Sequence, residues 1–154
     1  MTDPIARLEI WFPAANTCAP TLSAWSIGAH CEHALLAIRG IAESMATSLP
    51  GAEPQKITLV GRVVLAARRI PRGKGVSPTS VLPAPTISTE ALQALAAYAR
   101  AACAQIPELP RQAWWRHHLF GVLHRDLAQR FIRIHTEHHL RIIAEVHRQV
   151  HASD

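Results

Sequence analysis

The segment from about residue 124 to residue 150 constrains the fold most, because it combines helical periodicity with histidines on its apolar side. His135 and His139 are four residues apart, so a helix places their side chains one turn apart on one face. The apolar residues near that face are Ile132, Ile142, Ile143 and Val146. Burying an unpartnered polar group is costly. The segment therefore predicts a long core helix and a partner, such as a metal ion, for two imidazoles.

Other segments of the chain also have helical spacing, and they are separated by proline and glycine. We expect long helices over residues 21–49, 53–69 and 88–105, each with candidate capping residues or a stop signal at its ends. Residues 5–12 form either a short helix or an extended arm that Pro13 ends. Residues 57–65 are rich in β-branched residues, so a strand is the alternative there. We favour the helix because no partner strand is evident.

Two connections complete the chain. Residues 70–87 contain many prolines and glycines and predict a loop, and residues 111–123 form an aromatic connection before the last helix. The pattern predicts an all-α protein, in which residues 1–154 form a single domain and about four long helices share one core, as in a four-helix bundle.

Composition narrows the classes of partner. A chain of 154 residues with 49% apolar residues can bury a proper core, and its formal charge of +5 comes from arginines scattered along the chain. We therefore expect no nucleic-acid partner. No apolar run approaches a membrane span, and the first residues lack the pattern of a signal peptide. Three widely spaced cysteines, Cys18, Cys31 and Cys103, predict a reducing, cytoplasmic compartment.

The candidate site needs a third imidazole from another helix. The segment 21–49 offers His30 and His33, and on a helical wheel His30 lies nearer to the apolar face. Neutral imidazole is a common ligand of zinc, nickel and iron, and three protein ligands leave a coordination position open for catalysis. His138 points about 100° away from His139 and is expected to be a neighbour of the site or a partly exposed residue.

Residues 25–33 begin with Trp-Ser and end with His33, and residues 134–140 contain the spacing His-x-x-x-His. Together these motifs resemble those of the DinB-like superfamily, and residues 70–75 and 120–123 resemble connecting loops of a branch without an assigned function. The resemblance implies an up-down helical bundle, often a homodimer, with a divalent metal on His33, His135 and His139. The family's long first helix is expected to be trimmed here, because the N-terminal segment is short and broken by prolines.

Three functions follow as hypotheses. The first is a metal-dependent hydrolase or thiol transferase acting on a small molecule, in line with the activities that the resemblance implies. The second is a non-catalytic bundle that serves in binding or stress-associated interactions and keeps a structural or vestigial metal site. The third is an anion- or nucleic-acid-binding module that uses the cations Arg68, Arg69, Arg72 and Lys74.

Overall fold

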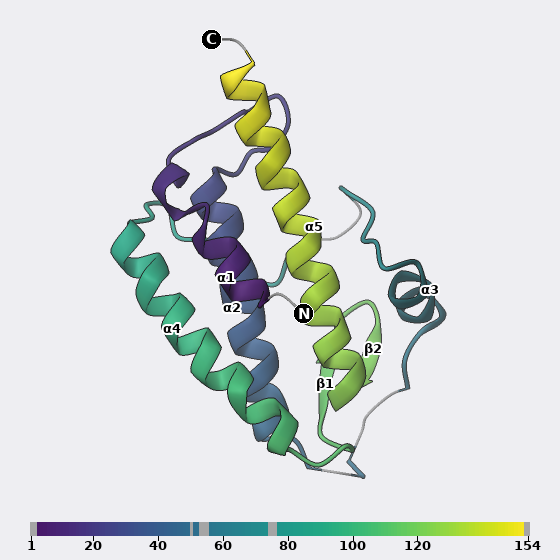
Figure 1. The fold of residues 1–154 in the computed structure, drawn as a ribbon. Coiled ribbons are helices and arrows are strands. Elements are labelled where there is room, and N and C mark those ends of the chain that lie inside the picture. The colour runs from purple at the N-terminus through teal and green to yellow at the C-terminus, as the bar shows by residue number, and fades with distance from the viewer. Residues whose placement is uncertain (1–2, 50, 53–55, 74–76, 153–154) are drawn as a thin grey trace.

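The chain is mostly helical, with one small sheet (Figure 1). The structure is a computed structural model that describes residues 3–49, 51–52, 56–73 and 77–152. The helices are α1 (Pro4–Glu9), α2 (Ile27–Ala46), α3 (Leu59–Ala67), α4 (Thr89–Gln105) and α5 (Arg125–His151). Short 3₁₀ turns are η1 (Phe12–Ala14), η2 (Thr79–Val81) and η3 (Ile106–Glu108), and the strands are β1 (Trp114–His117) and β2 (Gly121–His124). The all-α class is thus roughly right.

Helix α2 is the central helix of the core, and its start is fixed by a serine cap. The hydroxyl of Ser26 accepts a hydrogen bond from the Ala29 N–H at 3.1 Å, so the helix begins at Ile27 rather than at residue 21. The predicted apolar face is confirmed, since all of its members are buried: Ile27, Cys31, Ala34, Leu35, Ile38, Ile41, Ala42 and Met45. This face packs against α4 and α5.

The three long helices do not alternate in direction along the chain. Figure 1 shows α2 and α4 running the same way and α5 running the opposite way. The chain between α2 and α4, residues 47–88, is long enough to return to the starting end of the bundle. Helix α1 is short, as expected for a trimmed N-terminal segment, and packs against α2, α4 and α5. A simple up-down order of four long helices therefore does not describe the arrangement.

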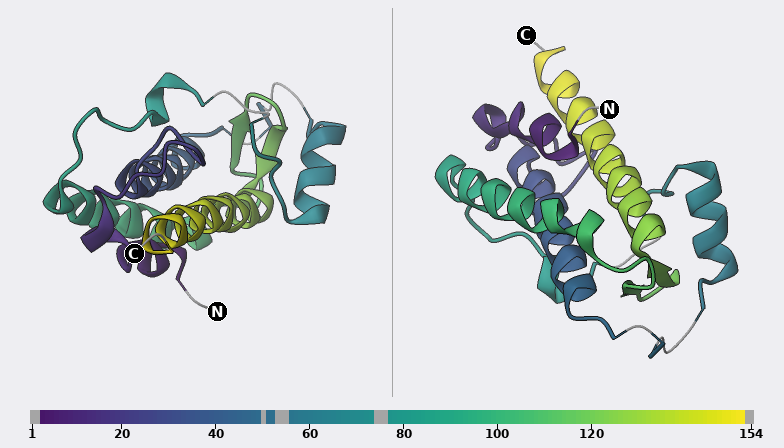
Figure 2. Two further views of the ribbon diagram at one scale, coloured as in Figure 1. Left: turned by 90° about the horizontal axis from the view of Figure 1, so that it is seen from above. Right: turned by 60° about the horizontal axis from the view of Figure 1, so that its bottom comes forward.

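Helix α3 lies apart from the core that the long helices share (Figure 2). Val64 and Leu65 are buried, whereas Leu59 and Val63 have 76% and 58% of their surface exposed. The predicted helix at this place is confirmed, but its predicted apolar stripe is only partly buried. Its first predicted residues, 53–55, lie outside the described residues.

The aromatic connection is in fact a β-hairpin, which the sequence analysis missed. Strands β1 and β2 pair antiparallel, with Trp114 opposite His124 and His117 opposite Gly121. Gly121 has a φ of +74°, a left-handed conformation that suits glycine. The turn is held by Thr58, whose N–H donates to the Phe120 carbonyl at 2.9 Å. The hairpin lies between α3 and the long helices in Figure 2, so tertiary contacts stabilise this short sheet.

The remaining boundaries agree closely with the sequence. The Ser88 hydroxyl accepts from the Ala91 N–H and caps α4, and α5 covers the predicted segment almost residue for residue. Within the predicted loop 70–87 the described residues contain only the short turn η2. Tyr98 of α4 is exposed, and its hydroxyl donates to Glu43 at 2.8 Å.

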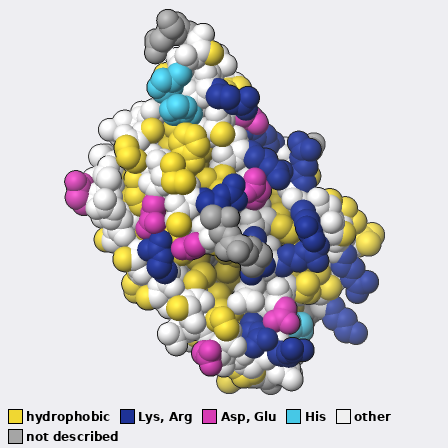
Figure 3. Space-filling model, viewed as in Figure 1, with side chains coloured by type: hydrophobic (Ala, Val, Ile, Leu, Met, Phe, Trp, Pro, Cys, Tyr) yellow, Lys and Arg dark blue, Asp and Glu magenta, His cyan; other side chains and the backbone are white. Residues whose placement is uncertain are grey.

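Several surface arginines form ion pairs with acidic side chains. Figure 3 shows Lys and Arg gathered on the side of this face that includes α3, where Arg62, Arg68 and Arg69 are exposed. Arg72 forms an ion pair with Glu145 at 2.7 Å, and Lys74 lies outside the described residues. None of the helices in the described part of the chain is long and apolar enough to cross a membrane.

We predict opposite stability effects for alanine at two glycines. A Cβ at Gly121 would collide with the Lys56 carbonyl, and the φ is unfavourable, so Gly121→Ala should lower the free energy of unfolding by about 2 kcal/mol or more. Gly40 lies inside α2 with no atom within 4 Å of its Cβ position. Gly40→Ala should therefore raise the free energy of unfolding by about 0.5–1 kcal/mol. Urea unfolding measures both, and equal effects would contradict this account.

Candidate metal centre

Three histidines from two helices meet where α2 packs against α5. His33 comes from α2, and His135 and His139 lie one turn apart on α5. One ring nitrogen of each lies within 4.8 Å of the others. The ring centroid of His33 lies 5.1 Å from that of His135 and 4.7 Å from that of His139. The structure thus brings together the three residues that the sequence motifs select.

The hydrogen bonds of His33 leave one nitrogen available to a ligand. Its Nδ1–H donates to the backbone carbonyl of Val81 in η2 at 2.7 Å, so its Nε2 carries the lone pair. That Nε2 lies 3.3 Å from the Nε2 of His135. Two nitrogens that bind one tetrahedral ion at 2.0–2.1 Å are separated by about 3.3 Å. The pair is therefore spaced as a shared ion requires.

His30 is also buried but is not part of the triad. Its Nδ1 lies 3.0 Å from the Nδ1 of His139, and its Nε2 lies 2.9 Å from the hydroxyl of Ser23. The exposed fractions of His30 and His33 are 3% and 4%, so the helical wheel did not separate them. Both histidines are buried because the neighbouring elements cover a wide arc of α2. His30 contacts His139 rather than joining the triad.

The Trp-Ser start of the motif has a physical role at this site. Ser26 caps α2 and so fixes where the helix begins, which in turn fixes the direction of His33 two turns later. Trp25 packs over the imidazoles, with ring centroids 5.3 Å from His30, 5.0 Å from His33 and 6.4 Å from His139. The indole thereby keeps bulk water from this side of the cluster.

Burial holds the cluster in the neutral form. Burial, followed by the charges of His33, His138 and Arg72, lowers the pKa of His30 to about 4. Burial also lowers the pKa of His33, although its bond to Val81 opposes the shift. For His135 and His139 burial and neighbouring imidazoles place the pKa well below the usual value. Neutral imidazole is the form that binds a metal, so the ligands are prepared at neutral pH.

The triad lies in the wall of a cavity of about 820 Å³. The loop that contains η2 and the hairpin also contribute to its wall, with Val81, Trp115 and Phe120 among the lining residues. None of the described lining residues is an Asp or a Glu. The cavity is therefore apolar and aromatic, and the imidazoles are its main polar groups.

His117 of β1 is a cavity residue whose role the sequence gave no reason to select. Its Nδ1 accepts the N–H groups of Leu119 at 3.0 Å and Phe120 at 3.3 Å, which leaves the proton on Nε2. Burial, and then the charge of His118, lower its pKa to about 4. His117 is thus a neutral residue that also caps the hairpin turn.

The other histidines lie beside the triad or away from it. His138 is half-buried, and its hydrogen bond to the Ile70 backbone opposes a pKa lowered mainly by burial. The Ile70 backbone therefore supports this imidazole. His147 and His151 stack on each other at 4.1 Å near the end of α5. His118 and His124 are exposed on the hairpin.

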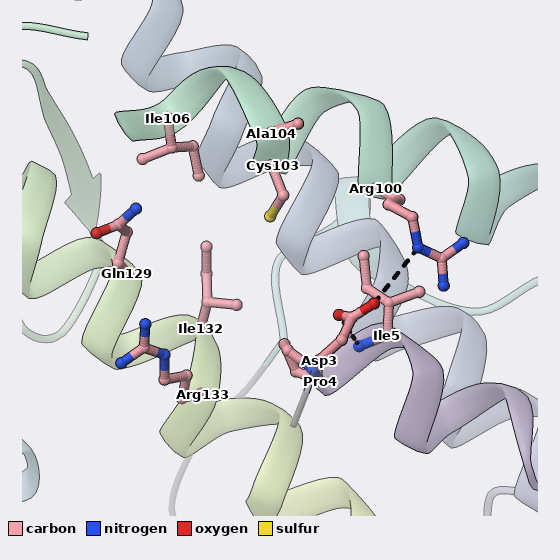
Figure 4. A pocket seen from close by; sticks show the side chains of 10 residues that line it. All are labelled: Asp3, Pro4, Ile5, Arg100, Cys103, Ala104, Ile106, Gln129, Ile132 and Arg133. Carbon is pink, nitrogen blue, oxygen red and sulfur yellow. Dashed lines mark hydrogen bonds and ion pairs between the residues drawn. The ribbon is translucent and has the colours of Figure 1, made fainter. Parts of the chain in front are cut away.

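A second hollow lies on a different face of α5 (Figure 4). It has a volume of about 300 Å³ and lies among α1, α4 and α5. Arg100 is paired there with Asp3 at 3.4 Å, and burial raises the pKa of the Cys103 thiol to about 11. The Cys103 thiol is protonated and the Arg100 charge is paired, so this hollow offers less chemistry than the histidine cavity.

Comparisons with protein-family models, with curated proteins and with solved structures found no match for this chain.

We predict that protonation of His117 destabilises the fold. Its folded pKa of about 4 lies below the ordinary 6.5, so its contribution is complete above pH 6.5 and is lost as the pH falls toward 4. His117→Asn keeps an acceptor for the turn but does not titrate. The stability advantage of the wild type over this variant should shrink by up to about 1.4 kcal/mol per pH unit below pH 6.5. Urea unfolding of both metal-free proteins at pH 7, 6 and 5 measures this advantage. A difference in stability that stays constant with pH would contradict the prediction.

Proposed function

We propose that this chain binds a divalent transition metal through His33, His135 and His139 and uses it on a small-molecule substrate. The observation that carries the proposal is the meeting of three neutral imidazole nitrogens within 4.8 Å in the wall of a cavity. Zinc, nickel and iron all suit such a donor set. A metal bound there would act as a Lewis acid and lower the pKa of a water or thiol bound to it.

The cavity supports an open coordination position. Three protein ligands leave a tetrahedral ion with one position for water or substrate. The 3.3 Å separation between the Nε2 atoms of His33 and His135 fits this geometry. Because the triad faces a cavity of about 820 Å³, a small molecule has room to reach that position.

The surrounding charges favour an anionic substrate. Neutral imidazoles do not offset the charge of a divalent ion, and the described residues of the cavity wall include no carboxylate. Glu32 accepts from the Ala84 N–H at 2.7 Å, and Glu137 pairs with Arg7 at 2.6 Å, so both ligand neighbours are engaged elsewhere. A substrate thiolate or carboxylate would supply the missing negative charge.

None of the described residues that line the cavity is a cysteine, so the cavity wall supplies no thiol as the nucleophile of a thiol transfer. Burial raises the pKa of the Cys31 thiol to about 12 and that of Cys103 to about 11. Thiol transfer would therefore use a thiol carried by the substrate. In hydrolysis, only an imidazole of the described wall could serve as general base, and half-buried His138 is the nearest candidate along α5.

We also propose membership of the DinB-like superfamily. Its support is the pair of histidine motifs and the physical roles of Trp25 and Ser26 at the cluster. The proposed metal site does not depend on this membership.

We predict stoichiometric metal binding that requires the triad. Metal-free, untagged wild-type protein should bind one Zn²⁺ or Co²⁺ per chain in a calorimetric titration. His135→Ala should weaken binding by more than about 100-fold, because it removes a ligand rather than a supporting residue. The control His124→Ala removes an exposed hairpin histidine and should bind like the wild type.

The open position has its own test. Adding a small thiol to the Co²⁺ form should produce a sulfur-to-cobalt charge-transfer band as the thiolate takes that position. An unchanged spectrum would contradict an open site, and absence of stoichiometric metal in the wild type would contradict the metal site itself.

A further inference from the structure

We infer that His30 is a positioning residue for the metal site, which accepts a hydrogen bond from His139 and thereby selects Nε2 of His139 as the ligand atom. This inference rests on the proposed metal site and goes beyond it, because it assigns a role to a histidine outside the triad. The chain of contacts runs from Ser23 through His30 to His139.

The contact between His30 and His139 joins two Nδ1 atoms at 3.0 Å. Two lone pairs repel at that distance, so one proton must lie between the rings, and either ring can supply it. If His30 donates, a neutral His139 carries its own proton on Nε2 and has no lone pair for a metal. If His139 donates, its Nε2 is free to bind.

Metal binding selects the second arrangement. A neutral imidazole that binds through Nε2 keeps its proton on Nδ1, and ligating histidines usually donate that proton to a supporting acceptor. Among the described residues, the hydrogen-bond partner of the His139 Nδ1 is the Nδ1 of His30. His139 has only 5% of its surface exposed, so without His30 that N–H would be buried unpaired.

Ser23 completes the chain at its outer end. His30 must then carry its proton on Nε2, which lies 2.9 Å from the Ser23 hydroxyl. The Ser23 oxygen also accepts a hydrogen bond from the backbone N–H of Trp25 at 3.1 Å. Its two lone pairs can accept this bond and the one from His30. A hydroxyl rotates freely, and Ser23 is half-buried, so its own proton can turn toward solvent.

The two ligands with known supports are therefore held by different means. His33 donates its Nδ1–H to the Val81 carbonyl at 2.7 Å, which is always an acceptor. His139 depends on a side chain that can be either donor or acceptor. The second support is the one that a single substitution can remove or restore.

The test compares two replacements of His30 with a control histidine. His30→Leu removes the acceptor, whereas His30→Asn places an amide oxygen near the position of Nδ1. The control His147→Leu removes a half-buried histidine two turns further along α5, which contacts Trp11 rather than the cluster. The Zn²⁺ affinity of each variant is measured by competition with a chromophoric chelator.

His30→Leu should weaken zinc binding by about 10–100-fold, His30→Asn should recover most of that loss, and His147→Leu should match the wild type. Equal affinities of the wild type and His30→Leu would overturn the role of His30, while the metal site would stand. A wild type that binds no zinc would overturn the proposed function and this inference together.

A spectroscopic readout keeps the inference testable if a variant fails to fold. Long-range ¹H–¹⁵N correlation spectra of the zinc-loaded wild type identify the protonated nitrogen of each imidazole. The expected result is a protonated Nδ1 in His139 and a protonated Nε2 in His30. A His139 that binds zinc through Nδ1, or a His30 protonated on Nδ1, would overturn the inference.

Discussion

The packing of α2 against α5 brings four imidazoles together, three of them fully buried, and the rest of the site depends on that contact. A buried imidazole must find partners, because an unpaired polar group in the core is costly. Here the partners are the Val81 carbonyl, the Ser23 hydroxyl and the other imidazoles themselves. Burial keeps the cluster neutral, and none of the described cavity-wall residues is a carboxylate, so the cluster is suited to bind a cation rather than to form ion pairs.

The segments outside the long helices define what the site can do. The loop after α3 contributes Val81, which orients His33, and the hairpin contributes the aromatic wall and His117. Both lie outside the long helices, and both contribute residues to the wall of the cavity. The site thus combines rigid ligand positions on two packed helices with a wall of connecting segments, where substrate specificity is usually set.

The sequence predicted those parts of the structure that depend on local patterns. Serine caps and apolar periodicity located α2, α4 and α5, and spacing alone placed His135 and His139 on one face. The motif selected His33, but helical periodicity could not distinguish it from His30, because both are buried and their roles depend on which ring nitrogen faces α5. The hairpin was missed because its pairing depends on the contact of its turn with Thr58. His117 was not selected, since its tautomer depends on that same turn. Such long-range contacts leave no periodic signal in the sequence.

The central claim is that three imidazoles bind one metal ion and leave a position open. X-ray absorption spectroscopy of the zinc-loaded protein tests this most directly, because it reports the number and type of the nearest ligands. The account predicts three imidazole nitrogens and one further oxygen or nitrogen from solvent at about 2.0–2.1 Å. Fewer than three imidazoles, a sulfur ligand from a cysteine, or a fourth imidazole that closes the coordination shell would contradict it.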